Sequence, residues 1–143
     1  MSDIQKMKFL LLFFLFALTQ SVTQRQVIDC ARNQLGKPYV YGAAGPNSFD
    51  CSGLAYYCHG SSIPRTAAAQ SAGSGKTIKK ANVQPGDLMF WNTSGNGVSH
   101  TTICSGNGNM IHAPKTGDVV KEVAYKGNSY YEPRFVNAKR YWK

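Results

Sequence analysis

Two kinds of residue in this chain can together carry out nucleophilic chemistry: a cysteine at an expected helix start, and histidines. Cys51 follows a loop rich in Gly, Pro and Asn (residues 42–48) and begins a short apolar stretch. A helix N-terminus and a nearby imidazolium lower the pKa of a thiol, ordinarily near 8.5, and so favour the reactive thiolate. Asp50 and Ser52 are residue types that cap such a start. We therefore predict that Cys51 is a nucleophile with a lowered pKa.

A thiol nucleophile needs a base within hydrogen-bonding reach, and the base needs a third group to orient it. His59 is excluded because it lies about 12 Å from Cys51 at the far end of the same helix; we interpret it as a surface residue there. His100 and His112 lie on two expected strands that flank the turn at residues 106–108. A three-residue loop makes them diagonal neighbours on one face, whereas a two- or four-residue loop sends His112 to the opposite face. The spacing permits a Cys-His-His triad without requiring one.

The elements that must position these side chains follow an α+β order, with helices first and an antiparallel sheet after them. Apolar spacing and stop residues predict helices at residues 22–36, 51–59 and 66–72. Residues 73–80 are expected to be a polar surface loop. Alternation and turn residues predict strands at residues 88–91, 99–105, 109–113, 119–124 and 134–142.

The N-terminus has the layout of a secretory signal peptide. Lys6 and Lys8 precede an unbroken apolar run at residues 9–18, which is short for a bilayer span, and small and polar residues follow. We expect cleavage after residues 1–21 and one exported domain at residues 22–143, with no stable membrane insertion. The formal charge of +9 falls to +8 on removal of Lys6, Lys8 and Asp3. The cations are scattered and no nucleic-acid motif accompanies them, so an anionic surface is a better partner than a nucleic acid.

Four cysteines in an exported chain allow two disulfides, but at most one if Cys51 stays free. Cys58 follows Cys51 by seven residues and shares its helix face, while Cys104 follows His100 by four and shares its strand face. We therefore expect Cys58 and Cys104 to be core neighbours or a disulfide, with Cys30 left over. Without a C-x-x-C pair, no structural zinc is expected, and no other metal or cofactor.

Six short motifs in order resemble the NlpC family of cell-wall cysteine peptidases, which have a papain-like α+β fold. The resemblance extends from about residue 22 to residue 141. It rests on these segments, quoted as they stand: Pro38-Tyr39-Val40-Tyr41-Gly42, Phe49-Asp50-Cys51-Ser52-Gly53-Leu54, Ile63-Pro64-Arg65-Thr66, Gln84-Pro85-Gly86-Asp87-Leu88, Ser99-His100 and Met110-Ile111-His112-Ala113.

The resemblance implies a role for each matching residue. The nucleophile falls on Cys51, the base on His100 and the orienting residue on His112. Tyr39 matches a tyrosine whose hydroxyl helps to hold the oxyanion beside the Cys51 backbone N–H, a contribution of roughly 3–4 kcal/mol in related chemistry. Asp50 and Ser52 match the two positions that, in the family, hold the free amine of the substrate's stem peptide.

The chain also departs from the family pattern. Tyr41 stands where the family usually has Trp, and Ala43 replaces its usual second Gly. After the base, residues 101–104 read Thr-Thr-Ile-Cys where the family prefers Val-Gly-Ile-Tyr. These changes leave the expected triad intact but alter the expected pocket shape. Arg65 is a candidate carboxylate ligand, and a loop-bracing role is an equal alternative.

The resemblance implies a secreted, monomeric cysteine endopeptidase that cleaves peptidoglycan stem peptides between D-γ-glutamate and the diamino acid. One alternative is a different enzyme on the same scaffold, either an amidase cutting the sugar–peptide link or an acyltransferase. The other is a wall-binding module that keeps the fold without chemistry. Reactivity of Cys51 and the identity of the released fragments distinguish them.

Overall fold

The computed structural model describes residues 2–8 and 21–143. The apolar run at residues 9–18, on which the signal-peptide prediction depends, lies outside the described residues. Residues 3–8 are helical. Among the described residues, no helix has both the length and the apolar character needed to cross a bilayer.

Three helices begin at side-chain caps that the sequence supplies locally. They are α2 (Gln24–Asn33), α3 (Cys51–Cys58) and α4 (Ala67–Ala72). Thr23 caps α2 in a reciprocal capping box with Gln26, Asp50 accepts from the Gly53 N–H at the start of α3, and Thr66 accepts from the Ala69 N–H at the start of α4. Each cap satisfies an N–H group that has no partner within its helix. The three predicted helices are confirmed. Each is shorter than predicted, because the capping residues at its ends are not helical.

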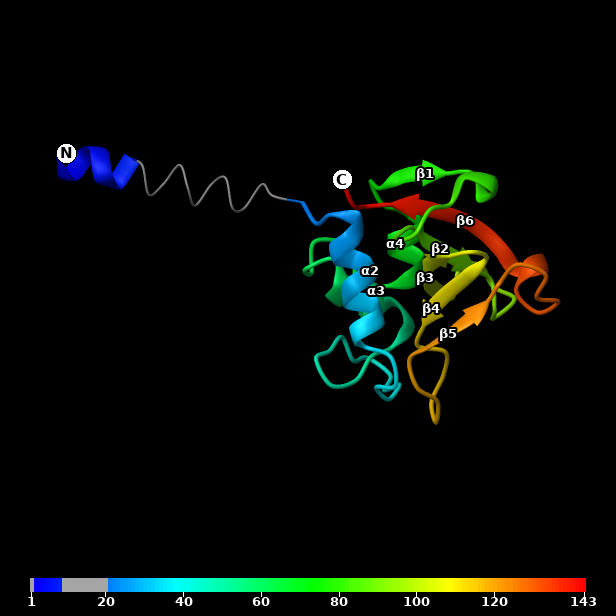
Figure 1. The fold of residues 1–143 in the computed structure, drawn as a ribbon. Helices are drawn as coiled ribbons and strands as arrows, with labels where there is room; N and C mark the ends of the chain where they lie inside the picture. Colours follow the sequence, from blue (N-terminus) through cyan, green and yellow to red (C-terminus); the bar gives the residue numbers. More distant parts are fainter. Residues whose placement is uncertain (1, 9–20) are drawn as a thin grey trace.

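The remaining chain forms a six-stranded antiparallel sheet in the order β1-β6-β2-β3-β4-β5 (Figure 1). The α+β class with N-terminal helices on a C-terminal sheet is therefore confirmed. Two 3₁₀ turns, η1 (Lys80–Asn82) and η2 (Glu132–Arg134), flank the strands. The strands are β1 (Lys76–Ile78), β2 (Leu88–Trp91), β3 (His100–Gly106), β4 (Asn109–His112), β5 (Lys121–Ala124) and β6 (Phe135–Arg140).

Strand β1 lies in the segment that the sequence predicts to be a polar loop. It pairs with β6 from Lys76 opposite Arg140 to Ile78 opposite Ala138. Only Ile78 of its three residues is buried. A three-residue edge strand with one apolar residue carries no alternating pattern, so its pairing partner determines that it forms.

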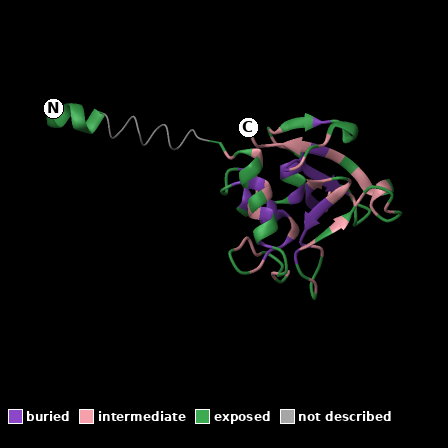
Figure 2. Cartoon of the chain, in the orientation of Figure 1, coloured by how far each residue is buried: buried purple, intermediate pink, exposed green. Residues whose placement is uncertain are grey.

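The two faces of the sheet pack into different apolar clusters. Leu88, Phe90 and Ile103 pack with α2 and α3, whereas Met89 and Trp91 belong to a cluster on the opposite face. The alternation along β2 is the period of two expected for a strand buried on both sides. Buried residues accordingly concentrate in α3 and the central strands, while the outer side of α2 is exposed (Figure 2).

The β3–β4 hairpin sets the position of the second histidine. Its turn consists of Asn107 and Gly108, both at positive φ, which is the two-residue alternative. A register shift between Cys104 and Gly106 leaves Ser105 unpaired, so that one extra residue on β3 compensates for the shorter turn. Ile103 therefore pairs with Ile111, which is the register that the three-residue loop predicts.

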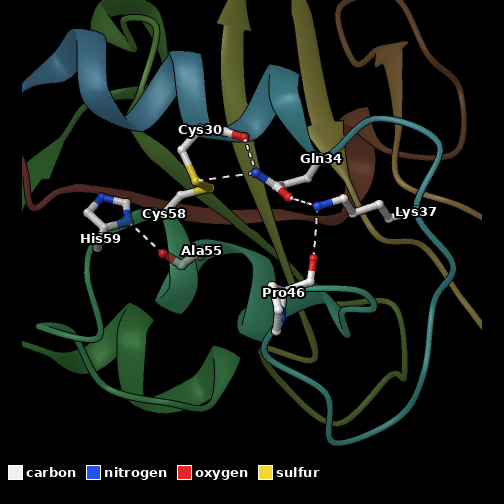
Figure 3. The surroundings of a disulfide bond; sticks show 7 residues. All are labelled: Cys30, Gln34, Lys37, Pro46, Ala55, Cys58 and His59. Atoms are coloured by element: carbon white, nitrogen blue, oxygen red, sulfur yellow. Dashed lines mark hydrogen bonds between the residues drawn. A yellow bond between two sulfur atoms is a disulfide. The ribbon is translucent and has the colours of Figure 1, made fainter.

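The expectation that Cys58 and Cys104 are core neighbours or a disulfide is wrong. Cys58 forms a disulfide with Cys30, with 5.4 Å between their Cα atoms, which links α2 to α3 (Figure 3). Cys104 is a free, buried thiol in the cluster on the opposite face of the sheet. On β3, Thr101 bonds to Gln70 of α4 and Ile103 packs with α2 and α3, whereas Cys104 belongs to the cluster on the opposite face.

Candidate active site

Cys51 is the first residue of α3, and its thiol lies against the start of β3. The backbone N–H groups of Thr101, Ser52 and Cys51 itself lie near the thiol, and each lowers its pKa. Thr101 directly follows His100 along β3. The helix start therefore brings the predicted nucleophile next to the strand that carries the predicted base.

The net pKa of Cys51 nevertheless moves in the direction opposite to the prediction. Burial raises the pKa of this thiol above its ordinary value, and the Asp50 carboxylate adds to the rise. A helix start contributes roughly 0.3–2 kcal/mol to a nearby charge, whereas burial shifts pKa values by up to 3–5 units, or roughly 4–7 kcal/mol. Burial is therefore the larger effect, and the free protein holds a neutral thiol.

His100 and His112 meet side by side, at the start of β3 and the end of β4. His100 Nε2 lies 2.9 Å from His112 Nδ1, and the rings meet edge-on with centroids 5.1 Å apart. Both side chains are buried, at 5% and 3% exposure. Burial lowers the pKa of His100 to about 3, aided by His112, and burial with the Lys121 charge lowers that of His112 to about 4. Both imidazoles are therefore neutral near pH 7.

Tyr39 shares a hollow of about 450 Å³ with Cys51. Ser99, which precedes His100, lines the same hollow. Burial raises the pKa of the Tyr39 hydroxyl, and proximity to Cys51 raises it further. The hydroxyl thus stays protonated and is available as a hydrogen-bond donor beside the thiol.

Asp50 and Ser52 are held by a guanidinium. Arg65 binds both carboxylate oxygens of Asp50, at 3.0 and 2.9 Å, and donates to Ser52 Oγ at 3.0 Å. Asp50 also accepts from the backbone N–H groups of Gly42 and Gly53. The two predicted amine ligands therefore line the hollow together, but the carboxylate already has a cation. Of the two roles open to Arg65, the structure shows loop bracing, and its side chain also lines the hollow.

Gln70 on α4 is a residue that sequence reasoning missed. Its buried amide donates to the Ser52 and Pro64 carbonyls, at 3.0 and 2.8 Å, and accepts from the Thr101 hydroxyl at 2.9 Å. It thus joins the first turn of α3, the segment that carries Arg65, and the strand that begins at His100. No local pattern distinguishes it from a surface residue of an Ala-rich helix, because its partners come from three other segments.

His59 was expected at the surface and is fully buried. Its Nδ1 lies 2.7 Å from the Ala55 carbonyl, beside the Cys30–Cys58 disulfide (Figure 3). Burial lowers its pKa, so it is held neutral. The helix end is covered because Tyr141 from the C-terminal segment packs edge-on against the ring.

Residues 36–140 match the model of the NlpC/P60 family. A probable endopeptidase of Corynebacterium glutamicum is 42% identical over 103 residues, covering 70% of this chain and 47% of the relative. Murein DD-endopeptidase MepH of Escherichia coli is 35% identical over 114 residues, covering 75% of this chain and 42% of MepH. The crystal structure of an NlpC/P60 family protein from Bacillus cereus superposes with a TM-score of 0.77 at 32% identity, covering 87% of this chain and 42% of that one.

The chain thus spans less than half the length of each of these proteins. The match runs from the segment before Tyr39 to the end of β6 and includes every residue of the site described above. The chain therefore belongs to the NlpC/P60 family, whose papain-like α+β fold it has.

Proposed function

We propose that this protein is a cysteine peptidase that hydrolyses peptide bonds in peptidoglycan stem peptides. The observation that carries the proposal is the 2.9 Å contact between His100 and His112 at the strand start where the Cys51 thiol lies. A nucleophile, a base and a group that orients the base are the minimum for thiol-based acyl transfer. The names of two relatives, an endopeptidase and a murein DD-endopeptidase, support the substrate class.

The contact between the histidines indicates how the base works. If Nε2–H of His100 donates to Nδ1 of His112, then Nδ1 of His100 keeps its lone pair and can accept the thiol proton. The raised thiol pKa and the lowered histidine pKa values favour a neutral pair at rest. Proton transfer from Cys51 to His100 therefore accompanies attack on the substrate, and a preformed ion pair is not required.

The reaction proceeds through a thioester. The Cys51 sulfur bonds to the amide carbon, and the carbonyl electrons move to oxygen, where the Tyr39 hydroxyl and the Cys51 backbone N–H stabilise the negative charge. The C–N bond then breaks as His100 returns its proton to the leaving amine. Water, deprotonated by His100, hydrolyses the thioester and restores the thiol.

The bond we propose is the one between D-γ-glutamate and the diamino acid. Asp50, Ser52 and Arg65 line the hollow beside Cys51. A short stem peptide carries a free amine and a carboxylate, which suit the Asp50 carboxylate and the Arg65 guanidinium respectively. We further propose that the protein acts as an exported monomer after removal of residues 1–21.

The test is incubation of the protein with defined muropeptides, with products weighed by mass spectrometry. Cleavage inside the stem is expected for the wild type and loss of cleavage for Cys51→Ala. Cys104→Ala is the matched control, because Cys104 is the other free thiol and lies on the opposite face of the sheet. Full activity of Cys51→Ala refutes the mechanism, and a released whole stem or a transferred acyl group refutes the bond. A cut at the D-Ala cross-link indicates the specificity named for MepH.

A further inference from the structure

A second hollow, of about 430 Å³, lies against the histidine pair. Both His100 and His112 line it, together with Tyr131, whose ring stacks over His100 with 6.4 Å between centroids. Neither Cys51 nor any other residue of the first hollow lines it. The histidine pair therefore lines a cavity that is distinct from the one beside Cys51 and similar to it in size.

The second hollow carries an excess of positive charge. Lys115, Asp118 and Lys121 line its wall. Lys121 Nζ lies 2.8 Å from Asp118, and the charges of both lysines lower the Asp118 pKa. Lys121 also contributes to the lowered pKa of His112, which places its ammonium close to the imidazole. Two ammonium groups thus share one carboxylate, and the exposed Lys115 can bind a second anion.

The proposed chemistry decides which half of a substrate reaches each hollow. The acyl half bonds to Cys51 and so occupies the first hollow. The leaving nitrogen takes its proton from His100, so the residue that bears this nitrogen must lie against that imidazole. The second hollow is the cavity on that side, because His100 lines it and Cys51 does not.

We infer that the second hollow binds a carboxylate carried by the leaving residue of the substrate, with Lys115 and Lys121 as its ligands. This inference rests on the proposed peptidase function and adds a preference to it. A diamino acid with a free carboxylate places its anion near the two ammonium groups. The same residue with a carboxamide loses that attraction and gains nothing from Asp118, which Lys121 already satisfies.

A matched pair of muropeptides tests the preference. The two differ only in a free carboxylate or a carboxamide on the diamino acid. We expect the wild type to have a KM about two- to fivefold lower for the carboxylate, which is the range for partly exposed ion pairs. Lys115→Met should reduce this ratio toward one, whereas Lys79→Met, a matched change beside η1, should leave it unaltered.

A second substitution should change the ratio of KM values in the opposite direction. This distinguishes a change in substrate binding from a general structural effect. Asp118→Asn removes the competing carboxylate but keeps the oxygen that accepts from the Val119 N–H at 2.8 Å. It should raise the preference for the carboxylate substrate. Equal KM values for the two wild-type substrates, or an unchanged ratio in both Lys115→Met and Asp118→Asn, would overturn the assignment.

A binding experiment separates failure of this inference from failure of the proposed function. The leaving fragment alone, a diamino acid dipeptide with a free carboxylate, is titrated into the ¹⁵N-labelled wild-type protein. Chemical-shift changes at Lys115 and Lys121 that are absent with the carboxamide dipeptide support the subsite even if no muropeptide is cleaved. Cleavage without such changes refutes the subsite and leaves the peptidase function standing.

Discussion

Mild acid should destabilise this protein strongly, because its histidines are buried in the neutral form. His100 and His112 have pKa values of about 3 and about 4 in the folded protein, against 6.5 for an ordinary histidine. Below pH 6.5 the unfolded chain therefore binds a proton at each of these histidines. In the folded chain the same histidines stay neutral down to about pH 4 or lower. The contribution of the neutral histidines to the unfolding free energy is therefore fully present above pH 6.5, and it is lost as the pH falls below this value.

The size of the effect follows from these pKa values. Between pH 7.5 and pH 5.0 each of the two histidines costs about 2 kcal/mol of unfolding free energy, or about 4 kcal/mol together. Burial lowers the pKa of His59 as well, which acts in the same direction. Because domains are stable by roughly 5–15 kcal/mol, this loss is a large share of the total. Most carboxylates contribute little, since they titrate mainly below pH 5.

Urea denaturation at pH 7.5 and 5.0, followed by tryptophan fluorescence, measures the difference directly. Trp91 is fully buried and reports unfolding of the sheet. The variant His112→Asn should lose about 2 kcal/mol of the pH dependence, because asparagine does not titrate in this range. Equal unfolding free energies at the two pH values, within about 1 kcal/mol, would show that the histidines are charged or solvated in the fold and would refute the neutral pair.

Substitutions at three further residues test the supports of the site. Cys58→Ser removes the disulfide that links Cys30 and Cys58, which are 28 residues apart in sequence, and should cost about 3–4 kcal/mol of unfolding free energy. Reduction of this disulfide should have the same effect, and an unchanged urea midpoint contradicts the prediction. Gln70→Leu should lower kcat about ten- to hundredfold with a smaller change in KM, because helix α3 and strand β3 can then shift relative to each other; a KM effect alone contradicts a positioning role. Arg65→Met should cost about 1–3 kcal/mol by leaving Asp50 unpaired, with Arg65→Lys intermediate because lysine lacks the bidentate fork; equal stability of all three proteins by urea denaturation argues against the ion pair.

Features of the fold that depend on neighbouring residues were predictable from the sequence. The caps at Thr23, Asp50 and Thr66 start the helices where the sequence indicates, because each cap acts within three residues. The strands that alternate or are β-branched also form as predicted. The sequence left the β3–β4 register open. The turn has two residues, and a bulge at Ser105 restores the register expected for a three-residue loop.

Features that depend on which segments meet in space were not predictable in this way. The disulfide partner of Cys58 depends on which face of β3 meets α3, and Cys104 lies on the other face. His59 is buried by Tyr141, a residue more than eighty positions away in the chain. Neither relation leaves a trace in local composition or periodicity.

The charge state of the site shows why identifying catalytic atoms and predicting their chemistry are separate problems. Motif order in the sequence identifies Cys51, His100 and His112 as candidate catalytic groups, and the structure brings the two histidines into contact. Their pKa values depend on desolvation, which the whole fold sets, and desolvation outweighs the helix start that the sequence reveals. In the proposed mechanism, the thiol and the imidazoles are neutral until substrate binds. Charges form only when the amide carbonyl accepts the sulfur and the Tyr39 hydroxyl stabilises the oxyanion.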